Sequence, residues 1–394
     1  MSREEALARQ QRQEHQRQME AESRELAKGP IDMPFLMLVV VLTAIGLVML
    51  FSASFPRAYY KENDPAKYLI RQGIFAVGGF IAMYIVGKIN YQRYRALSKI
   101  LMMVAIVLLV LVLIPGIGQI RNNARRWIGI GDILTFQPSE IAKFAVVLYF
   151  SDSISKKKDK MRTLRYGIAP YALILLVIAG LMMLEPHLSG TVLILGVGAI
   201  LMLVGGIGWG WVGGALGLGA LGAYLLIGVI GYGQSRVSMW LDPWQDPLDE
   251  GYQMTQSLIS IGSGGLWGVG LGKSRQKFLY LPEEHNDFIF SIVCEELGLI
   301  GAAIIMLLFA ALILRGYWIA LHARDRFGSL LVVGVTSLLA MQTFLNIGVV
   351  TGLLPATGIS LPFFSYGGTA LLIQLAEMGV VLSVSRQMKP TRGG

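Results

Sequence analysis

The chain alternates between long apolar runs and shorter polar segments. Ten of the runs are long enough to cross the roughly 30 Å hydrocarbon core of a bilayer as helices. They lie near residues 33–53, 69–87, 100–116, 137–152, 166–184, 189–207, 210–231, 287–314, 328–352 and 364–385. The pattern therefore predicts an all-α, polytopic membrane protein with about ten transmembrane helices and both termini on one side.

The longest polar connection, residues 232–286, follows the seventh predicted helix. Loops of this length are usually functional. Its glycine-rich stretch 262–272 is too short to span a membrane, so it either lies at the interface or dips back toward the bundle. An inverted repeat of the kind found in many transporters is not evident.

The polar tail 1–29 is rich in Gln, Glu and Arg and lacks the apolar core of a signal peptide. We expect it to be cytosolic and disordered. Residues 30–386 then form the ten-helix membrane domain, and 387–394 form a short cytosolic tail.

Composition supports this class of protein. Of the 394 residues, 54% are hydrophobic and 15% charged, with a mean hydropathy of +0.58, which excludes an ordinary soluble fold. The net charge of +9 is typical of basic cytoplasmic loops and does not require nucleic-acid binding. The single cysteine, Cys294, excludes an intramolecular disulfide and argues against a cysteine metal site.

The distribution of basic side chains indicates how the protein is oriented in the membrane. They gather in the even-numbered loops, at 88–99, 156–165 and 322–326, and again at 386–392. Because cytoplasmic loops carry the excess of Lys and Arg, that side and both termini are predicted to be cytoplasmic. Segments 54–68, 117–136, 232–286 and 353–363 then face the outside.

The strongest candidate for chemistry is Asp287, where a polar stretch becomes an apolar run at Phe288. A carboxylate at this boundary is partly desolvated, which raises its pKa toward that of a useful base. His285 could tune it or bind substrate, or make only a loop hydrogen bond. Glu295 and Glu296 lie about two turns deeper and must face protein, a cation or a cavity. We expect them to hold the bundle together.

Several cations lie on the predicted outer side, against the usual bias. Guanidinium groups pair well with phosphate oxygens, so they indicate a site for an anionic lipid headgroup such as a diphosphate. Snorkelling to ordinary phospholipid is the alternative. The candidate substrate-binding residues here are Arg125 and Arg126 with the neighbouring Trp127, and Lys273, Arg275 and Lys277; Arg236 lies in the same long segment.

Two further groups stand out. Glu140 and Lys143 are one turn apart at the start of the fourth helix and can pair, either to fix packing or to serve catalysis. The stretch 346–369 is broken by Gly and Pro, and such backbone must line a cavity or be covered by protein. Its Ser365 hydroxyl could contact sugar or serve only the turn.

Together these motifs resemble the SEDS family of peptidoglycan glycosyltransferases, which includes FtsW, RodA and SpoVE. The resemblance covers about 33–385 and rests on Arg126-Trp127, Gln137-Pro138-Ser139-Glu140, Pro282-Glu283-x-His285-x-Asp287-Phe288-Ile289-Phe290 with Glu295-Glu296-Leu297-Gly298, and the late Gly/Pro motif. Residues 277–284 favour the FtsW/SpoVE branch. The chain departs from many members at Asn286, where they have Thr, and at 185–191.

The resemblance implies polymerisation of lipid II at the outer face of the bacterial cytoplasmic membrane, with Asp287 as the essential acid. It also implies a class B penicillin-binding transpeptidase and other divisome or elongasome proteins as partners. Asp287 would accept the proton of the acceptor 4-hydroxyl as that oxygen attacks the donor C1, with inversion. The outer cations would neutralise the undecaprenyl diphosphate that leaves. A divalent cation (Mg or Mn) could do so instead, although no tight oxygen-ligand motif is present.

Two other classes stay open. A lipid II flippase, or another transporter of lipid-linked oligosaccharides, would use buried acids and lateral openings for passage. A noncatalytic scaffold for a cell-wall complex predicts that Asp287 is dispensable. A polymerase needs its acid and its cations together on the outer face, where the predicted topology puts them.

Overall fold

The computed structural model describes residues 29–121, 124–130, 134–224, 228 and 234–388. The predicted polar tail, all but its last residue, and the end of the C-terminal tail lie outside the described residues. Every predicted apolar run contains a helix: α2 (Met33–Glu62), α3 (Lys67–Lys88), α4 (Tyr94–Leu113), α5 (Pro138–Lys157), α6 (Ala169–Leu184), α7 (Leu188–Val204), α8 (Trp209–Tyr224), α11 (Ile289–Leu321), α12 (Arg326–Val350) and α13 (Gly368–Ser385).

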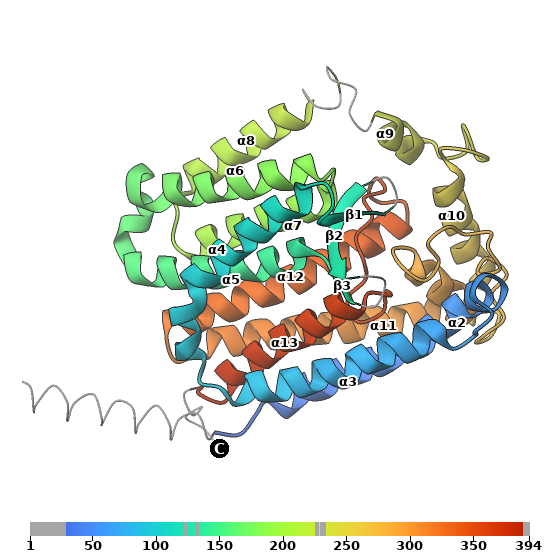
Figure 1. Cartoon of the computed structure of the whole chain (residues 1–394), viewed down its shortest axis with the longest axis horizontal. Coiled ribbons are helices and arrows are strands. Elements are labelled where there is room, and N and C mark those ends of the chain that lie inside the picture. The colour runs from blue at the N-terminus through green and yellow to red at the C-terminus, as the bar shows by residue number, and fades with distance from the viewer. Residues whose placement is uncertain (1–28, 122–123, 131–133, 225–227, 229–233, 389–394) are drawn as a thin grey trace, which may run out of the picture.

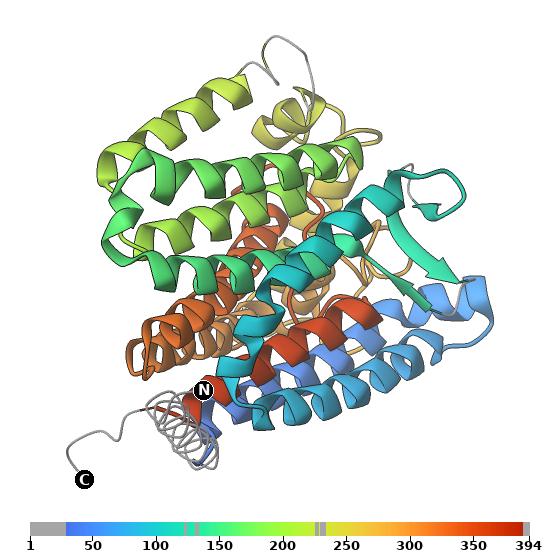
Figure 2. The same cartoon turned by 60° about the vertical axis from the view of Figure 1, so that its left-hand side comes forward.

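Seven helical spans in the described residues are long and apolar enough to cross a membrane by themselves. They contain α2, α3, α4, α6, α11, α12 and α13, and α7 is a shorter apolar helix. Helix α12 lies in the interior, in contact with α5, α7, α11 and α13. Helices α6 and α8 lie on the opposite side of the bundle from α2 and α3 (Figures 1 and 2). The prediction of an all-α polytopic membrane protein is confirmed.

Smaller elements fill the connections. Short helices η1 (Tyr91–Arg93), η2 (Lys158–Arg162) and η3 (Leu164–Ile168) precede α4 and α6, and α9 (Gln234–Leu241) and α10 (Tyr252–Gly264) lie in the long connection. Strands β1 (Gly118–Arg121), β2 (Ala124–Ile130) and β3 (Leu134–Phe136) form an antiparallel sheet in that order. The sequence predicted only a loop here, because short strands with few alternating apolar positions give a weak signal.

The two ends of the bundle are fixed by buried acids. Asp32 caps α2 by accepting from the Phe35 amide at 2.9 Å, and its carboxylate binds the Arg315 guanidinium near the end of α11. At the other end of α2, Arg57 binds Glu284, just before α11 begins. Helices α2 and α11 therefore run antiparallel, and each ion pair joins one end of α2 to α11 or its approach.

Helix α11 is interrupted at Gly298, where φ is 67°. The glycine-rich stretch after α10 fills the break: the Val269 amide donates to Glu295 O at 2.9 Å, and the Leu299 amide donates to Gly265 O at 2.9 Å. Backbone groups freed by the interruption are thus satisfied by protein, as the membrane interior requires. Of the two sequence alternatives, the stretch dips back toward the bundle.

Only glycine fits where this loop meets the broken helix. A Cβ atom at Gly268 would lie 2.1 Å from Glu296 O, and one at Gly298 would lie 2.3 Å from the Gly268 amide nitrogen. Both residues also have positive φ, which other residues rarely adopt. These glycines therefore permit the close backbone contact between the loop and the interrupted helix.

Candidate functional site

Asp287 lies two residues before α11, in a loop held by the Gly/Pro-rich segment after α12. The Asn346 side-chain nitrogen Nδ2 donates to Asp287 O at 2.7 Å and to Ile359 O at 2.6 Å. The Ser365 hydroxyl donates to Asn286 O at 2.8 Å, and the Tyr366 amide donates to His285 O at 2.9 Å. The two sequence motifs, far apart in the chain, therefore form one support around the acid.

The Asp287 carboxylate is half-buried, and among the described residues it makes no hydrogen bond or ion pair. Gly358 lies against it, because a Cβ there would be 3.3 Å from Oδ2. Burial raises the pKa of Asp287 from 3.8 to about 6, and the negative charge of Glu283 adds to the rise. His285 and Arg126 act in the opposite direction. Asp287 is thus ionised at neutral pH and remains basic enough to take a proton.

The residues just before Asp287 are fixed by an ion pair and by aromatic packing. Glu284 binds Arg57 in two contacts of 2.7 and 2.9 Å. Burial alone would raise the pKa of Glu284, but interactions with His285 and Arg57 lower it to about 2. The His285 ring packs on Tyr68 at 5.0 Å and on Tyr366 at 5.9 Å between centroids. This packing fixes the ring next to the candidate base.

The two neighbouring arginines of β2 point to different places, as adjacent residues in a strand do. Arg125 donates to Leu113 O at 3.0 Å, at the end of α4. Arg126 donates to Glu185 O at 3.2 Å and also to Pro186 O. Its charge lowers the pKa of Asp287, so Arg126 shares the environment of the acid. Trp127, also half-buried, follows in the same strand.

The corner between α6 and α7 places two titratable groups beside Arg126. Glu185 is fully buried, and neither carboxylate oxygen has a hydrogen-bond partner among the described residues. Burial raises its pKa to about 8, against the opposing charge of Arg126. Burial also lowers the pKa of His187 to about 3, helped by Arg126 and Lys143. The sequence singled out this stretch only as a departure from the family pattern. The position of an acid, Glu185, between two apolar runs was the feature that could have indicated a buried functional group.

The remaining candidate acids bind protein groups. Glu140 and Lys143 form an ion pair of 2.8 Å, with the lysine buried. The Glu295 carboxylate accepts from the Ser274 hydroxyl at 2.6 Å and from the Arg275 amide at 2.8 Å. Glu296 accepts from the Lys277 ammonium at 2.8 Å and from the Ser52 hydroxyl.

The candidate cations of the long connection separate into two kinds. Lys277 is only 2% exposed and is committed to Glu296, whereas Lys273 and the Arg275 side chain are exposed on the loop. Ser365 uses its hydroxyl within the turn, where it accepts from the Leu361 amide at 2.7 Å. Among the described residues no cluster of three or more His, Cys, Asp or Glu side chains could hold a metal ion. A divalent cation therefore stays a prediction.

The fold and the site define a polytopic helical membrane protein with an accessible carboxylate and a coupled arginine at one end of its bundle. Residues 33–390 match the family model of FtsW, RodA and SpoVE, described as "Cell cycle protein". The chain therefore belongs to the FtsW/RodA/SpoVE family, as the motifs predicted.

Relatives and solved structures agree along nearly the whole chain. Stage V sporulation protein E of Bacillus subtilis is 44% identical over 359 residues, covering 90% of this chain and 97% of the relative. Probable peptidoglycan glycosyltransferase FtsW of Geobacter metallireducens is 42% identical, covering 91% and 96%. A chain of a peptidoglycan synthase complex has a TM-score of 0.75 at 30% identity, covering 91% and 98%. Rod shape determining protein RodA of Thermus thermophilus gives 0.66 at 29% identity, with the same coverage.

Proposed function

We propose that this chain is a peptidoglycan glycosyltransferase that polymerises lipid II into glycan strands for division, cell-shape or sporulation wall synthesis. The observation that carries the proposal is the Asp287 carboxylate, which is half-buried, uncommitted to any described protein group and electrostatically coupled to Arg126. The enzyme class agrees with the names of relatives that match the chain over nearly their full length.

Asp287 acts as the general base. It takes the proton of the acceptor GlcNAc 4-hydroxyl as that oxygen forms a bond to C1 of the donor MurNAc. The bond from C1 to the diphosphate oxygen breaks on the opposite face, so the configuration inverts and undecaprenyl diphosphate leaves with the electron pair. A base of this kind contributes about 10² to 10⁴ in rate.

Arg126 is the cation best placed to stabilise the leaving diphosphate, because its charge already acts on Asp287. Lys273 and Arg275 extend from the loop and supply further positive charge. Arg125 points toward α4, so we assign it a supporting position at the edge of the site. We assign Lys277, with Glu295 and Glu296, to holding the re-entrant loop.

The active site faces outward from the bacterial cytoplasmic membrane, with both termini cytoplasmic. Arg386 donates to Gly29 O at 2.9 Å, which supports both described chain ends lying together. Asp32, which binds Arg315, and Arg57, which binds Glu284, lie at opposite ends of α2. Arg57 is at the end near Asp287. The basic loops that favour a cytoplasmic location therefore lie away from the catalytic end. The division into a tail 1–29, a membrane domain 30–386 and a tail 387–394 stays a prediction.

A class B penicillin-binding transpeptidase is the proposed partner. The support is the similarity to a chain from a peptidoglycan synthase complex in which polymerization and crosslinking are coordinated. Polymerisation at the outer face would supply the strand that such a partner crosslinks. Association with other divisome or elongasome proteins follows from the same proposal.

The proposal is tested with purified protein and lipid II, with and without the transpeptidase and with Mg²⁺ or Mn²⁺ varied. Glycan strands from wild type, and none from Asp287→Ala, are the expected result. No glycan under any condition, together with movement of lipid II across vesicle bilayers, would favour the flippase. A fully active Asp287→Ala protein would remove the acid from the mechanism.

A further inference from the structure

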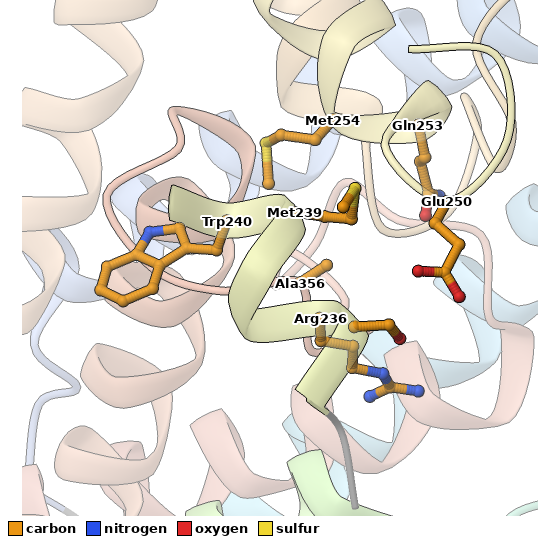
Figure 3. A pocket seen from close by; sticks show the side chains of 8 residues that line it. Arg236, Met239, Trp240, Glu250, Gln253, Met254 and Ala356 are labelled. Carbon is orange, nitrogen blue, oxygen red and sulfur yellow. The ribbon is translucent and has the colours of Figure 1, made fainter. Parts of the chain in front are cut away.

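A pocket beside the catalytic loop lies outside the machinery described above (Figure 3). Its volume is about 520 Å³ when the space open to solvent is included. Helix α9, the start of α10 and the segment after α12 form its walls. Its lining includes Arg236, Trp240, Glu250, Gln253, Met254 and Ala356.

The walls are attached to the two segments that hold Asp287. The Gln253 side-chain amide donates to Pro282 O at 3.4 Å, five residues before the acid. The Trp240 indole donates to Gly352 O at 3.0 Å. Ala356 lies two residues before Gly358, which abuts the Asp287 carboxylate. A group bound in this pocket would therefore lie next to the reacting sugars.

The lining combines an apolar wall with two opposite charges. Met254 is buried, and Trp240 is half-buried at one side. In Figure 3 the charged ends of Arg236 and Glu250 lie on the same side of the pocket. In the part of the chain that the structure describes, neither side chain makes a hydrogen bond or an ion pair. Both charges are thus available to a ligand.

This chemistry selects among the parts of a lipid-linked disaccharide pentapeptide. An acyl chain would contact only the apolar wall and would leave both exposed charges without a partner. A neutral sugar could stack on the aromatic wall and hydrogen-bond to both side chains, but it would neutralise neither charge. A peptide offers carboxylates for a guanidinium, an amino group for a carboxylate, and backbone amides for Gln253.

We propose that this pocket binds the peptide stem of the substrate, with Arg236 on a carboxylate and Glu250 on an amino group. This inference rests on the proposed function and deepens it. The pocket sets which stems are accepted, while Asp287 performs the chemistry.

The test compares lipid II carrying the full pentapeptide with an analogue that has no peptide stem and whose lactoyl carboxyl group is amidated, so that it offers neither a carboxylate nor an amino group. Arg236→Ala and Glu250→Ala should each raise KM for the full substrate about fivefold and leave kcat near wild type. Both variants should treat the analogue without a stem as wild type does. The matched control is Asp249→Asn, which removes an exposed acid that does not line the pocket and should change neither KM.

A soluble pentapeptide with a free carboxylate and a lysine amine provides a second readout. It should inhibit wild type competitively and inhibit Arg236→Ala much less. Equal KM changes for both substrates, or no change for either, would refute the pocket assignment while the polymerase activity stands. Absence of glycan from wild type with both substrates would instead refute the proposed function.

Discussion

The ionisation of Asp287 gives a quantitative prediction for the pH dependence of polymerisation. Burial and the nearby Glu283 raise its pKa from 3.8 to about 6, which corresponds to about 3 kcal/mol of differential interaction. A base with that pKa is about nine-tenths ionised at pH 7 and about one-tenth ionised at pH 5. The value of kcat/KM should therefore fall about tenfold over this interval. An enzyme whose base had a pKa of 3.8 would lose less than about a tenth of its rate between pH 7 and pH 5.

The assay is initial-rate glycan formation between pH 4.5 and 8 at lipid II concentrations well below KM, which reports the pKa of the free enzyme, with stability confirmed at each pH. Glu283→Gln removes the neighbouring negative charge that raises the pKa of Asp287, so it should move the acidic limb to lower pH. A profile that is flat to pH 5 would contradict the mechanism. So would a limb unchanged by Glu283→Gln.

Three other substitutions, two of them paired with a control substitution, test separate parts of the protein. Arg126→Ala should reduce turnover about 100-fold and move the acidic limb of the pH profile to higher pH. Arg125→Ala should keep a turnover near that of wild type. Equal losses in the two variants would contradict the different roles of the two arginines. Glu185→Gln should unfold at higher temperature than wild type, increasingly so from pH 5 to 8. The folded pKa of about 8 lies above the ordinary 4.5, so wild-type stability falls as pH rises through this window, and a constant difference would contradict the assignment. Lys277→Met should lower the free energy of unfolding by about 3 kcal/mol, because the buried Glu296 carboxylate loses its cation. Lys273→Met, at an exposed position, should change it by less than about 0.5 kcal/mol. Similar melting curves for the two variants would contradict a stabilising Lys277–Glu296 ion pair.

The helices could be predicted from the sequence because each apolar run carries its own signal. The sheet could not, since its strands are short and their pairing depends on residues distant in the chain. The sequence left two alternatives for the glycine-rich loop, the membrane interface or a return toward the bundle. The choice between them depends on the contact between Gly268 and the interruption of α11 at Gly298, which the local sequence pattern does not reveal. Local pattern therefore predicted the elements and left their close contacts open.

The candidate site was predictable to a similar degree. Asp287 stood out because a polar stretch ends there against an apolar run. Arg125 and Arg126 looked equivalent, and only the strand turns one toward α4 and the other toward the acid's environment. Lys277 was predicted to be one of the outer cations because it lies in a loop. Its buried partner, Glu296, is 19 residues away in sequence. Such partners follow from tertiary packing.

The most direct test of the central claim measures Asp287→Asn beside wild type for both lipid II binding and glycan formation. The substitution keeps the size of the side chain and removes its basicity. The mechanism predicts binding within a few-fold of wild type and turnover reduced by about 10² to 10⁴. Turnover retained at the wild-type level, with a correctly folded protein, would show that Asp287 is not the base.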